Sequence, residues 1–125
     1  MKWFRPILLL LTLGLPVAAA DPLPPAEIAE LRAQRKILGQ EALIKIREKN
    51  YRAAVPLLEE CNRIQEKIGE INTPNTAVHL LYLGIAHTRL GKAREARRAH
   101  ETSLAIASQC AKAGVKVPET IFTSN

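Results

Sequence analysis

Histidine is the side chain in this sequence best suited to metal binding or proton transfer, and the chain has three: His79, His87 and His100. A structural zinc site needs about four ligands from His, Cys or carboxylate side chains. No cysteine or carboxylate stands at a metal-ligand spacing from these histidines, so the pattern indicates no metal. We therefore expect no metal site and no cofactor.

The other reactive side chains do not assemble a catalytic pattern either. Glu59 and Glu60 are adjacent, and adjacent residues of a helix point about 100° apart, so the two carboxylates do not converge on one substrate. The sequence has no Gly-x-Ser-x-Gly motif, no phosphate-binding loop and no His-Glu-x-x-His motif. The chain is therefore not predicted to be an enzyme.

The first twenty residues have the layout of a secretory signal peptide. Lys2 and Arg5 give a basic start, an apolar run follows over 7–17, and alanines at 18–20 favour cleavage before Asp21. The run is shorter than the ~20 residues that an apolar helix needs to span a bilayer. We expect an exported chain, periplasmic or secreted, with no membrane span in its mature part.

Composition limits the mature chain to one small helical domain. The 125 residues are 47% apolar and only 4% aromatic, and the helix formers Ala, Leu, Glu, Lys and Arg dominate. The net charge of +6 falls to +4 when Lys2 and Arg5 leave with the leader, and the remaining basic residues look diffuse along the chain. Because aromatic residues are not interleaved with them, they do not indicate nucleic-acid binding.

Apolar residues at three- and four-residue steps predict helices after a Pro-rich lead-in at 21–25. The expected ranges are about 26–48, 52–68, 77–90 and 93–113. Gly39 weakens the first range and would divide it into a short lead helix and a second one. Asn75 or Thr76 is the expected N-cap of the third helix. Short loops favour antiparallel neighbours, so the helices should form two hairpins.

The two hairpins repeat one another at a spacing of 42 residues. The segment 50–54 lines up with 92–96, and Arg47 lines up with Arg89. The second unit, with Leu83-Gly84, then Leu90-Gly91 and then Glu95-Ala96, resembles a tetratricopeptide repeat of the long type found in kinesin light chains. The resemblance covers about 35–114 and is closer in the second unit than in the first.

The resemblance implies an all-α fold of two stacked antiparallel hairpins, a fragment of an α-solenoid. The chain would divide into a signal peptide at 1–20, the lead-in at 21–25, a helical domain at 26–114 with repeats at about 35–76 and 77–114, and a tail at 115–125. The residues that define the repeat packing would be Ala42, Tyr51, Ala54, Leu80, Leu83, Gly84, Gly91, Ala96 and Ser103. By resemblance, His87 and His100 take the places of the family's aromatic residues, so they would face each other inside the second hairpin and form a hydrogen-bonded core pair.

The family binds other proteins along the concave face that is lined by the first helix of each hairpin. By resemblance, the residues of this face are Lys36, Gln40, Leu43 and Arg47 in the first unit and Leu81, Ile85, Thr88 and Arg89 in the second. This apolar surface with basic edges suits an amphipathic or acidic segment of a partner. We expect a protein-binding adaptor or scaffold of an exported assembly. The alternative is a structural module that forms homo-oligomers by stacking its open repeat ends.

The coverage of these ends is left open by the sequence, because two repeats are fewer than the ~3 that such arrays usually need. The segment 26–37 would cover one end, the tail with Val117, Ile121 and Phe122 the other, or further copies of the chain would do so.

The state of the two cysteines is also open. Cys61 and Cys110 lie on helices expected to run side by side, yet about seven residues out of register, which is ~10 Å along the axis. Disulfide-bonded cysteines have Cα atoms within ~7 Å, so a bond forms only if the packing shifts. Otherwise Cys61 is a buried apolar residue and Cys110 is a thiol free to join two chains.

Overall fold

A computed structural model describes residues 22–123 of the chain, and within that range it is helical with no strand. The helices are α2 (Pro25–Arg47), α3 (Tyr51–Lys67), α4 (Pro74–Arg89), α5 (Ala93–Lys112) and the short α6 (Thr120–Thr123). The all-α prediction is confirmed. The predicted signal peptide at 1–20 lies outside the described residues. None of the described helices is both long and apolar enough to span a membrane.

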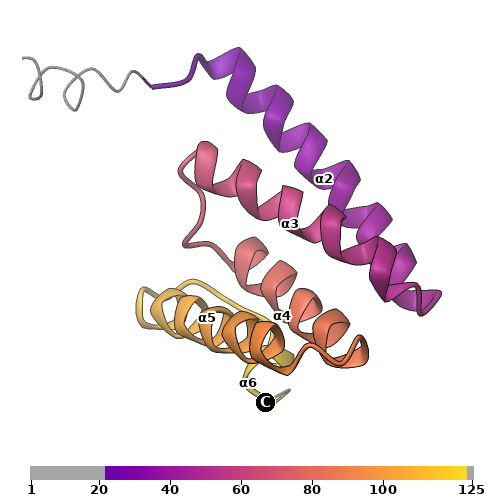
Figure 1. Cartoon of the computed structure of the whole chain (residues 1–125). Helices are drawn as coiled ribbons and strands as arrows, with labels where there is room; N and C mark the ends of the chain where they lie inside the picture. The colour runs from indigo at the N-terminus through magenta and orange to yellow at the C-terminus, as the bar shows by residue number, and fades with distance from the viewer. Residues whose placement is uncertain (1–21, 124–125) are drawn as a thin grey trace, which may run out of the picture.

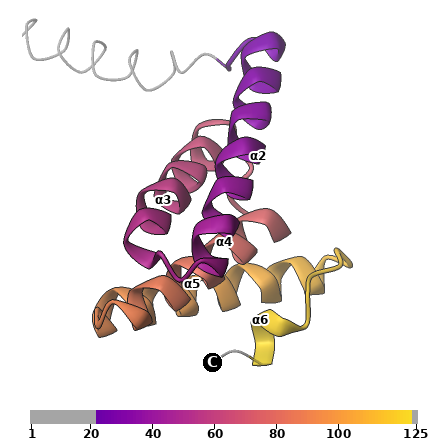
Figure 2. The same cartoon turned by 90° about the vertical axis from the view of Figure 1, so that its right-hand side faces the viewer.

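Two antiparallel hairpins, α2–α3 and α4–α5, are stacked on each other, as predicted (Figure 1). Contacts are most extensive within the hairpins, and α3 packs on α4 between them. The first helices of the two hairpins, α2 and α4, also touch. Figure 2 shows the N-terminal turns of α2 extending beyond the rest of the stack, with α6 at the opposite end.

The first and third helices begin and continue differently from the sequence-based prediction. The helix α2 runs unbroken through Gly39, because packing against α3 and α4 outweighs the ~1 kcal/mol that a mid-helix glycine costs. The helix α4 begins at Pro74 with Thr73 as its N-cap, so the predicted cap at Asn75 or Thr76 was wrong. Proline suits this place, since the first helical position needs no amide donor. Thr76 is buried instead, and its hydroxyl donates to the Glu70 carbonyl at 3.1 Å.

The two hairpin turns share one geometry. Lys49 and Gly91, 42 residues apart, both adopt positive φ, at 62° and 75°. The next backbone N–H reaches back in each case, from Asn50 to the Lys45 carbonyl and from Lys92 to the His87 carbonyl, both at 2.8 Å. These bonds satisfy carbonyls that the helix ends leave without a partner. The repeat seen in the sequence is thus a repeat of backbone conformation.

Small residues bring the helices of the core together. One buried cluster, Ala42, Ala54, Leu58, Leu83 and Ala99, joins the first hairpin to the second. A second cluster consists of Ala77, Leu81, Ile106, Ala107, Cys110 and Ile121, from α4, α5 and α6.

Of the residues expected to define the repeat packing, Ala42, Ala54 and Leu83 belong to the first cluster and Leu80 packs against both. Those that are buried are Ala42, Ala54, Leu83, Gly84, Ala96 and Ser103. Tyr51 and Leu80 are half-buried, and Gly91 is exposed because it forms the turn. The Ser103 hydroxyl donates to the Ala77 carbonyl at 2.6 Å and so fastens α5 to α4.

The tail covers the C-terminal end of the stack. It forms α6, whose Ile121 is buried in the second core cluster, with Val117 packed beside it. Phe122 contributes less and remains 42% exposed. One of the three ways of covering the repeat ends is therefore present in the structure.

Both cysteines are buried free thiols. Cys61 lies 3.6 Å from the Arg35 carbonyl and Cys110 lies 3.7 Å from the Asn72 carbonyl, each with its Sγ directed at that oxygen. Burial raises the pKa of the Cys61 thiol to about 11. The expectation that Cys110 is available to join two chains was wrong, because α4 and α6 enclose it.

His87 and His100 do not form the expected hydrogen-bonded pair. Among the described residues, no hydrogen bond joins them, and the Nδ1 atom of each is buried without a partner. The His100 ring lies against Gly84, where an added Cβ atom would come within 2.6–2.8 Å of three ring atoms. His100 thus fills space as an aromatic residue would, and Gly84 provides the room for it.

We predict that Gly84→Ala destabilises the protein although alanine is the better helix former. The added methyl meets three ring atoms of His100 at 2.6–2.8 Å, and overpacking of this kind costs about 1–3 kcal/mol. In a His100→Ala background the same substitution should stabilise by up to ~1 kcal/mol, because only the gain in helix propensity remains. Urea unfolding of the four proteins measures this coupling, and purely additive effects would show that the contact is not what requires glycine.

Candidate partner-binding groove

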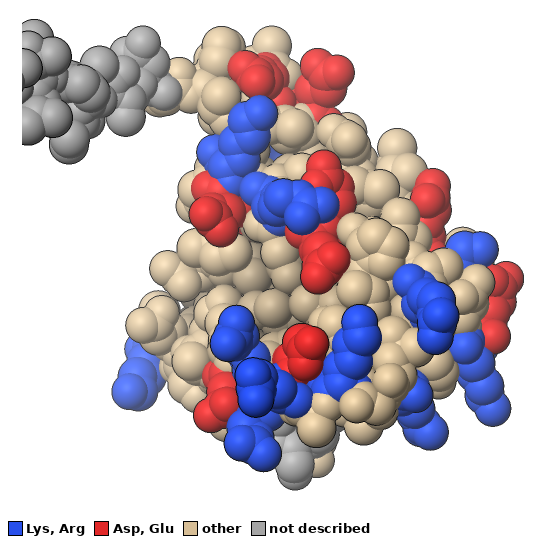
Figure 3. Space-filling model, viewed as in Figure 1, with Lys and Arg blue, Asp and Glu red and all other residues tan. Residues whose placement is uncertain are grey.

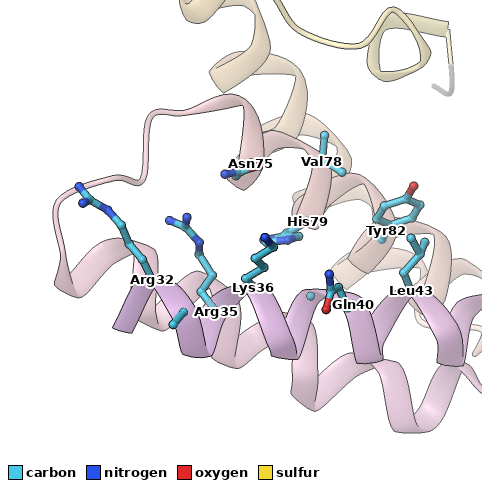
Figure 4. A pocket seen from close by; sticks show the side chains of 11 residues that line it. Arg32, Arg35, Lys36, Gln40, Leu43, Asn75, Val78, His79 and Tyr82 are labelled. Atoms are coloured by element: carbon cyan, nitrogen blue, oxygen red, sulfur yellow. The ribbon is translucent and has the colours of Figure 1, made fainter. Parts of the chain in front are cut away.

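A cavity of about 590 Å³ opens between α2 and α4, the first helices of the two hairpins. Its walls are the facing sides of these two helices (Figure 4). The lining residues from α2 are Arg32, Ala33, Arg35, Lys36, Gly39, Gln40 and Leu43, and those from α4 are Asn75, Val78, His79 and Tyr82. We call this cavity the groove.

The groove has a basic end and an apolar end. Arg32, Arg35 and Lys36 project from the N-terminal half of α2, whereas Leu43 and Tyr82 lie together at the other end (Figure 4). The order follows from the helical period, because residues three and four apart along α2 fall on one side of it. A ligand lying along α2 would therefore contact basic side chains at one end of the groove and apolar side chains at the other.

One carboxylate from the α3–α4 loop pairs with two of the three cations, so the basic end of the groove keeps a net positive charge. Glu70 accepts hydrogen bonds from Arg32, with 2.8 Å between the Arg32 Nε and the carboxylate, and from Arg35 at 2.8 Å. The hydrogen bonds from Arg32 and then Arg35 hold the pKa of Glu70 below its ordinary value. Lys36 makes no ion pair with any residue that the structure describes. It is thus the groove cation left to meet a ligand.

A buried chain of hydrogen bonds links this ion pair to the middle of the groove. Arg35 donates to the Gln65 Oε1 at 3.2 Å, so the Gln65 Nε2 is the donor toward the His79 Nδ1, 3.4 Å away. The proton of a neutral His79 is then on Nε2, beside Gly39. Burial, with a smaller contribution from the charge of Arg35, lowers the pKa of His79 to about 4. His79 is therefore neutral at physiological pH.

This arrangement suits non-covalent binding of an extended or helical segment. Lys36 supplies an unpaired positive charge, Gln40 and Asn75 supply amide groups, and Leu43 and Tyr82 supply apolar surface. The described residues contain no cluster of His, Cys, Asp and Glu that could hold a metal ion. The groove accordingly fits a segment with an acidic group at one end and apolar side chains at the other.

The structure brings together some of the predicted groove residues but not all. Lys36, Gln40 and Leu43 line the groove, while Arg47 lies beyond it at the end of α2. Leu81 is buried in the core against α5 and α6. Ile85, Thr88 and Arg89 line a different cavity, of about 520 Å³, together with His100.

This difference has a geometric reason. A groove between successive helices is lined by the side of α2 that faces α4 and by the side of α4 that faces α2. Equivalent repeat positions contribute from both helices, as with Lys36 and Val78, but on α4 the lining ends at Tyr82. Ile85 and Arg89 are equivalent to Leu43 and Arg47, so they lie on the side of α4 that a third repeat would cover.

Sequence reasoning missed the α4 wall, which consists of Asn75, Val78, His79 and Tyr82. Two of these residues carried a signal, because Val78 and Tyr82 stand 42 residues after Lys36 and Gln40. No signal in the sequence indicated the contribution of Glu70, since that contribution depends on how the α3–α4 loop folds back onto α2.

We predict that acid weakens the fold through His79. The unfolded chain binds a proton at this residue below a pH of about 6.5, whereas the folded protein does so only near pH 4, so stability falls as the pH drops between these values. Glu70 acts in the same direction below its unfolded pKa. In His79→Gln the loss of unfolding free energy between pH 7 and pH 4.5 should be smaller by roughly 2 kcal/mol. Equal losses in both proteins, measured by urea unfolding, would contradict this assignment.

Comparison with known proteins agrees with the repeat geometry. A family model described as Tetratricopeptide repeat matches residues 34–109, which is more than half of the chain and includes most of both hairpins. No curated protein and no solved structure matches. The kinship with the long repeats of kinesin light chains stays a prediction. With the sequence repeat, the stacked hairpins and the family match in agreement, the chain belongs to the tetratricopeptide repeat family.

Proposed function

We propose that this protein is an adaptor whose groove between α2 and α4 binds a segment of another protein. Tetratricopeptide repeats generally mediate protein–protein interaction. The observation that carries the proposal is the divided groove, with Lys36 unpaired at one end and the apolar Leu43 and Tyr82 at the other. The partner segment would place an acidic residue near Lys36 and apolar side chains near Tyr82.

Lys36 is the groove cation that an acidic residue of the partner can reach without competing with Glu70. Glu70 already accepts from the Nε and Nη2 of Arg32 and from the Nη1 of Arg35, so a partner's carboxylate would compete with it at these arginines. Breaking the partly buried pair of Arg35 and Glu70 is costly, whereas Lys36 is exposed and has no ion pair to lose. Specificity would then come mainly from the apolar half.

We place this activity in an exported assembly, periplasmic or secreted. The support is the leader layout at 1–20, which lies outside the described residues. Mass spectrometry of the protein purified from its native source tests this context. An N-terminus at Asp21 is expected, and an intact Met1 on protein found in the cytoplasm would contradict it.

A photo-crosslinking amino acid at Gln40 tests the groove directly. Gln40 lines the groove, while the neighbouring Glu41 is exposed but does not, so Glu41 is the matched control position. We expect a covalent adduct with a second protein from Gln40 and not from Glu41. Adding Lys36→Glu should reduce the yield of this adduct about tenfold, since a reversed charge at the interface costs over ~1.4 kcal/mol. Adducts of equal yield from both positions would rule out the groove as the binding site.

The alternative function, self-association, is favoured by one specific observation. Ile37 and Ile44, seven residues apart on the outer side of α2, are 57% and 48% exposed. The equivalent α4 positions, His79 and Ala86, are packed inside the stack. Because α6 covers the C-terminal end, two copies would meet through α2 alone and form a dimer, not a longer array.

Light scattering after size-exclusion chromatography tests this dimer. The mass should rise from 13.8 kDa per chain, less any leader removed, toward twice that value as concentration increases. The variant Ile37→Lys, Ile44→Lys should remain monomeric, while Val115→Lys, at another exposed apolar residue, should behave like the parent. A monomer at every concentration would exclude self-association through α2.

A further inference from the structure

The basic residues that look diffuse along the sequence gather in space at one edge of the stack. Residues 45–52 and 89–95, which include the two hairpin turns, carry seven Lys or Arg and two Glu, a net charge of +5 against +6 for the whole chain. The segments at the opposite edge, 67–76 and 112–119, carry three Lys and two Glu, a net charge of +1. We call the surface formed by 45–52 and 89–95 the turn edge.

The two parts of the turn edge are neighbours in the folded chain. Arg52 and Val55 of α3 line one cavity, of about 340 Å³, together with Leu90 and Lys92 from the second turn. Both turns lie at the right-hand side of Figure 1, and Figure 3, in the same view, shows Lys and Arg side chains on that side and a second group of them below and left of the centre. The charges of both repeats therefore act as one surface.

The exposed cations of the turn edge have no counter-charge paired with them among the described residues. The six exposed ones are Arg47, Lys49, Arg52, Arg89, Lys92 and Arg94. None of them makes an ion pair with any residue from 22 to 123. The nearby Glu48 is paired with Lys45 at 3.7 Å, which leaves Glu95 as the remaining carboxylate of the turn edge. Like charges so arranged repel one another, and an external anion would relieve the repulsion.

Local structure does not account for these cations. Arg52 and Arg94 occupy the first turns of α3 and α5, where the helix dipole favours negative side chains. Lys49 adopts a φ of 62°, a conformation that the equivalent Gly91 takes without strain. Each of these positions carries a positive charge although helix or turn geometry favours another residue.

The absence of large exposed apolar side chains from the turn edge indicates which kind of surface the turn edge can bind. No large apolar side chain is exposed within 45–52 or 89–95. A protein interface usually has an apolar centre, and a site for single-stranded nucleic acid has aromatic side chains on which bases stack. Anionic lipid headgroups require neither, because they attract basic residues through additive electrostatics without shape complementarity.

We propose that the turn edge docks on the anionic surface of a lipid bilayer. The groove shares no lining residue with the turn edge, so a membrane-docked molecule keeps the groove accessible to its partner segment. Docking is reversible and depends on ionic strength, because exposed charges are screened over about 8 Å at physiological salt. Membrane docking and partner binding use different residues, so an experiment can rule out docking while the proposal for the groove still stands.

Co-sedimentation with vesicles tests the proposal on the chain from Asp21 onward, which contains all five described helices. Circular dichroism first verifies that this chain and its variants are folded. We expect binding to vesicles of phosphatidylglycerol and phosphatidylcholine in equal amounts, loss of binding as salt is raised, and no binding to pure phosphatidylcholine. Affinity should fall by roughly fivefold for each cation removed.

The informative variant is Arg52→Glu, Lys92→Asp, Arg94→Glu. These changes place acidic side chains at helix N-termini, where they are favourable, so the fold should be kept while the turn edge loses its charge. The matched control, Lys67→Glu, Lys112→Glu, Lys116→Glu, makes the same change in net charge at the opposite edge and should still bind. Equal loss in both variants, binding to neutral vesicles, or retention by duplex DNA with none by anionic vesicles would each overturn the proposal.

Discussion

The close approach of helices at positions without side-chain bulk is the constraint on which this structure depends. Ala42, Ala54 and Ala99 have almost no exposed surface where the two hairpins meet, and Gly84 lies directly under the ring of His100. Side chains any larger would separate the helices, since protein interiors have little free volume. The helices α2 and α4 approach each other at another such position, Gly39, where an added Cβ atom would lie 3.1 Å from the His79 ring.

Glu70 connects the fold to the groove. It lies in the loop between the hairpins, yet it binds Arg32 and Arg35 of α2 and, through Arg35 and Gln65, is linked to His79 of α4. Three helices and a loop are thus held in one polar network beside the site. Networks of this kind tend to fix one arrangement of the parts, because a half-satisfied network is unfavourable. The groove is therefore formed before any ligand arrives.

The sequence predicted the architecture well because its signals were local or periodic. Leu83-Gly84, Leu90-Gly91 and Ala96 specify a hairpin through spacing alone, and the 42-residue repeat extends that reading to the first unit. The groove was predicted in part: Lys36, Gln40 and Leu43 lie in it, whereas Leu81 is buried and Arg89 is elsewhere. Helical periodicity gives the faces of one helix, but only packing decides which face meets a neighbour. The ion pairs of Glu70 join residues 35 and 38 positions apart, a range at which periodicity carries no information.

Because both thiols are buried, oxidation of the cysteines reports when the helices separate. Cys61 and Cys110 are at most 4% exposed, and their sulfurs are directed at backbone carbonyls. Thiol–disulfide exchange requires a thiolate that can reach its target, and the raised pKa of Cys61 leaves very little thiolate at neutral pH. An oxidant therefore reacts with the chain only while the helices are apart. In an oxidising compartment, the lifetime of the reduced protein would equal the waiting time for its stack to open.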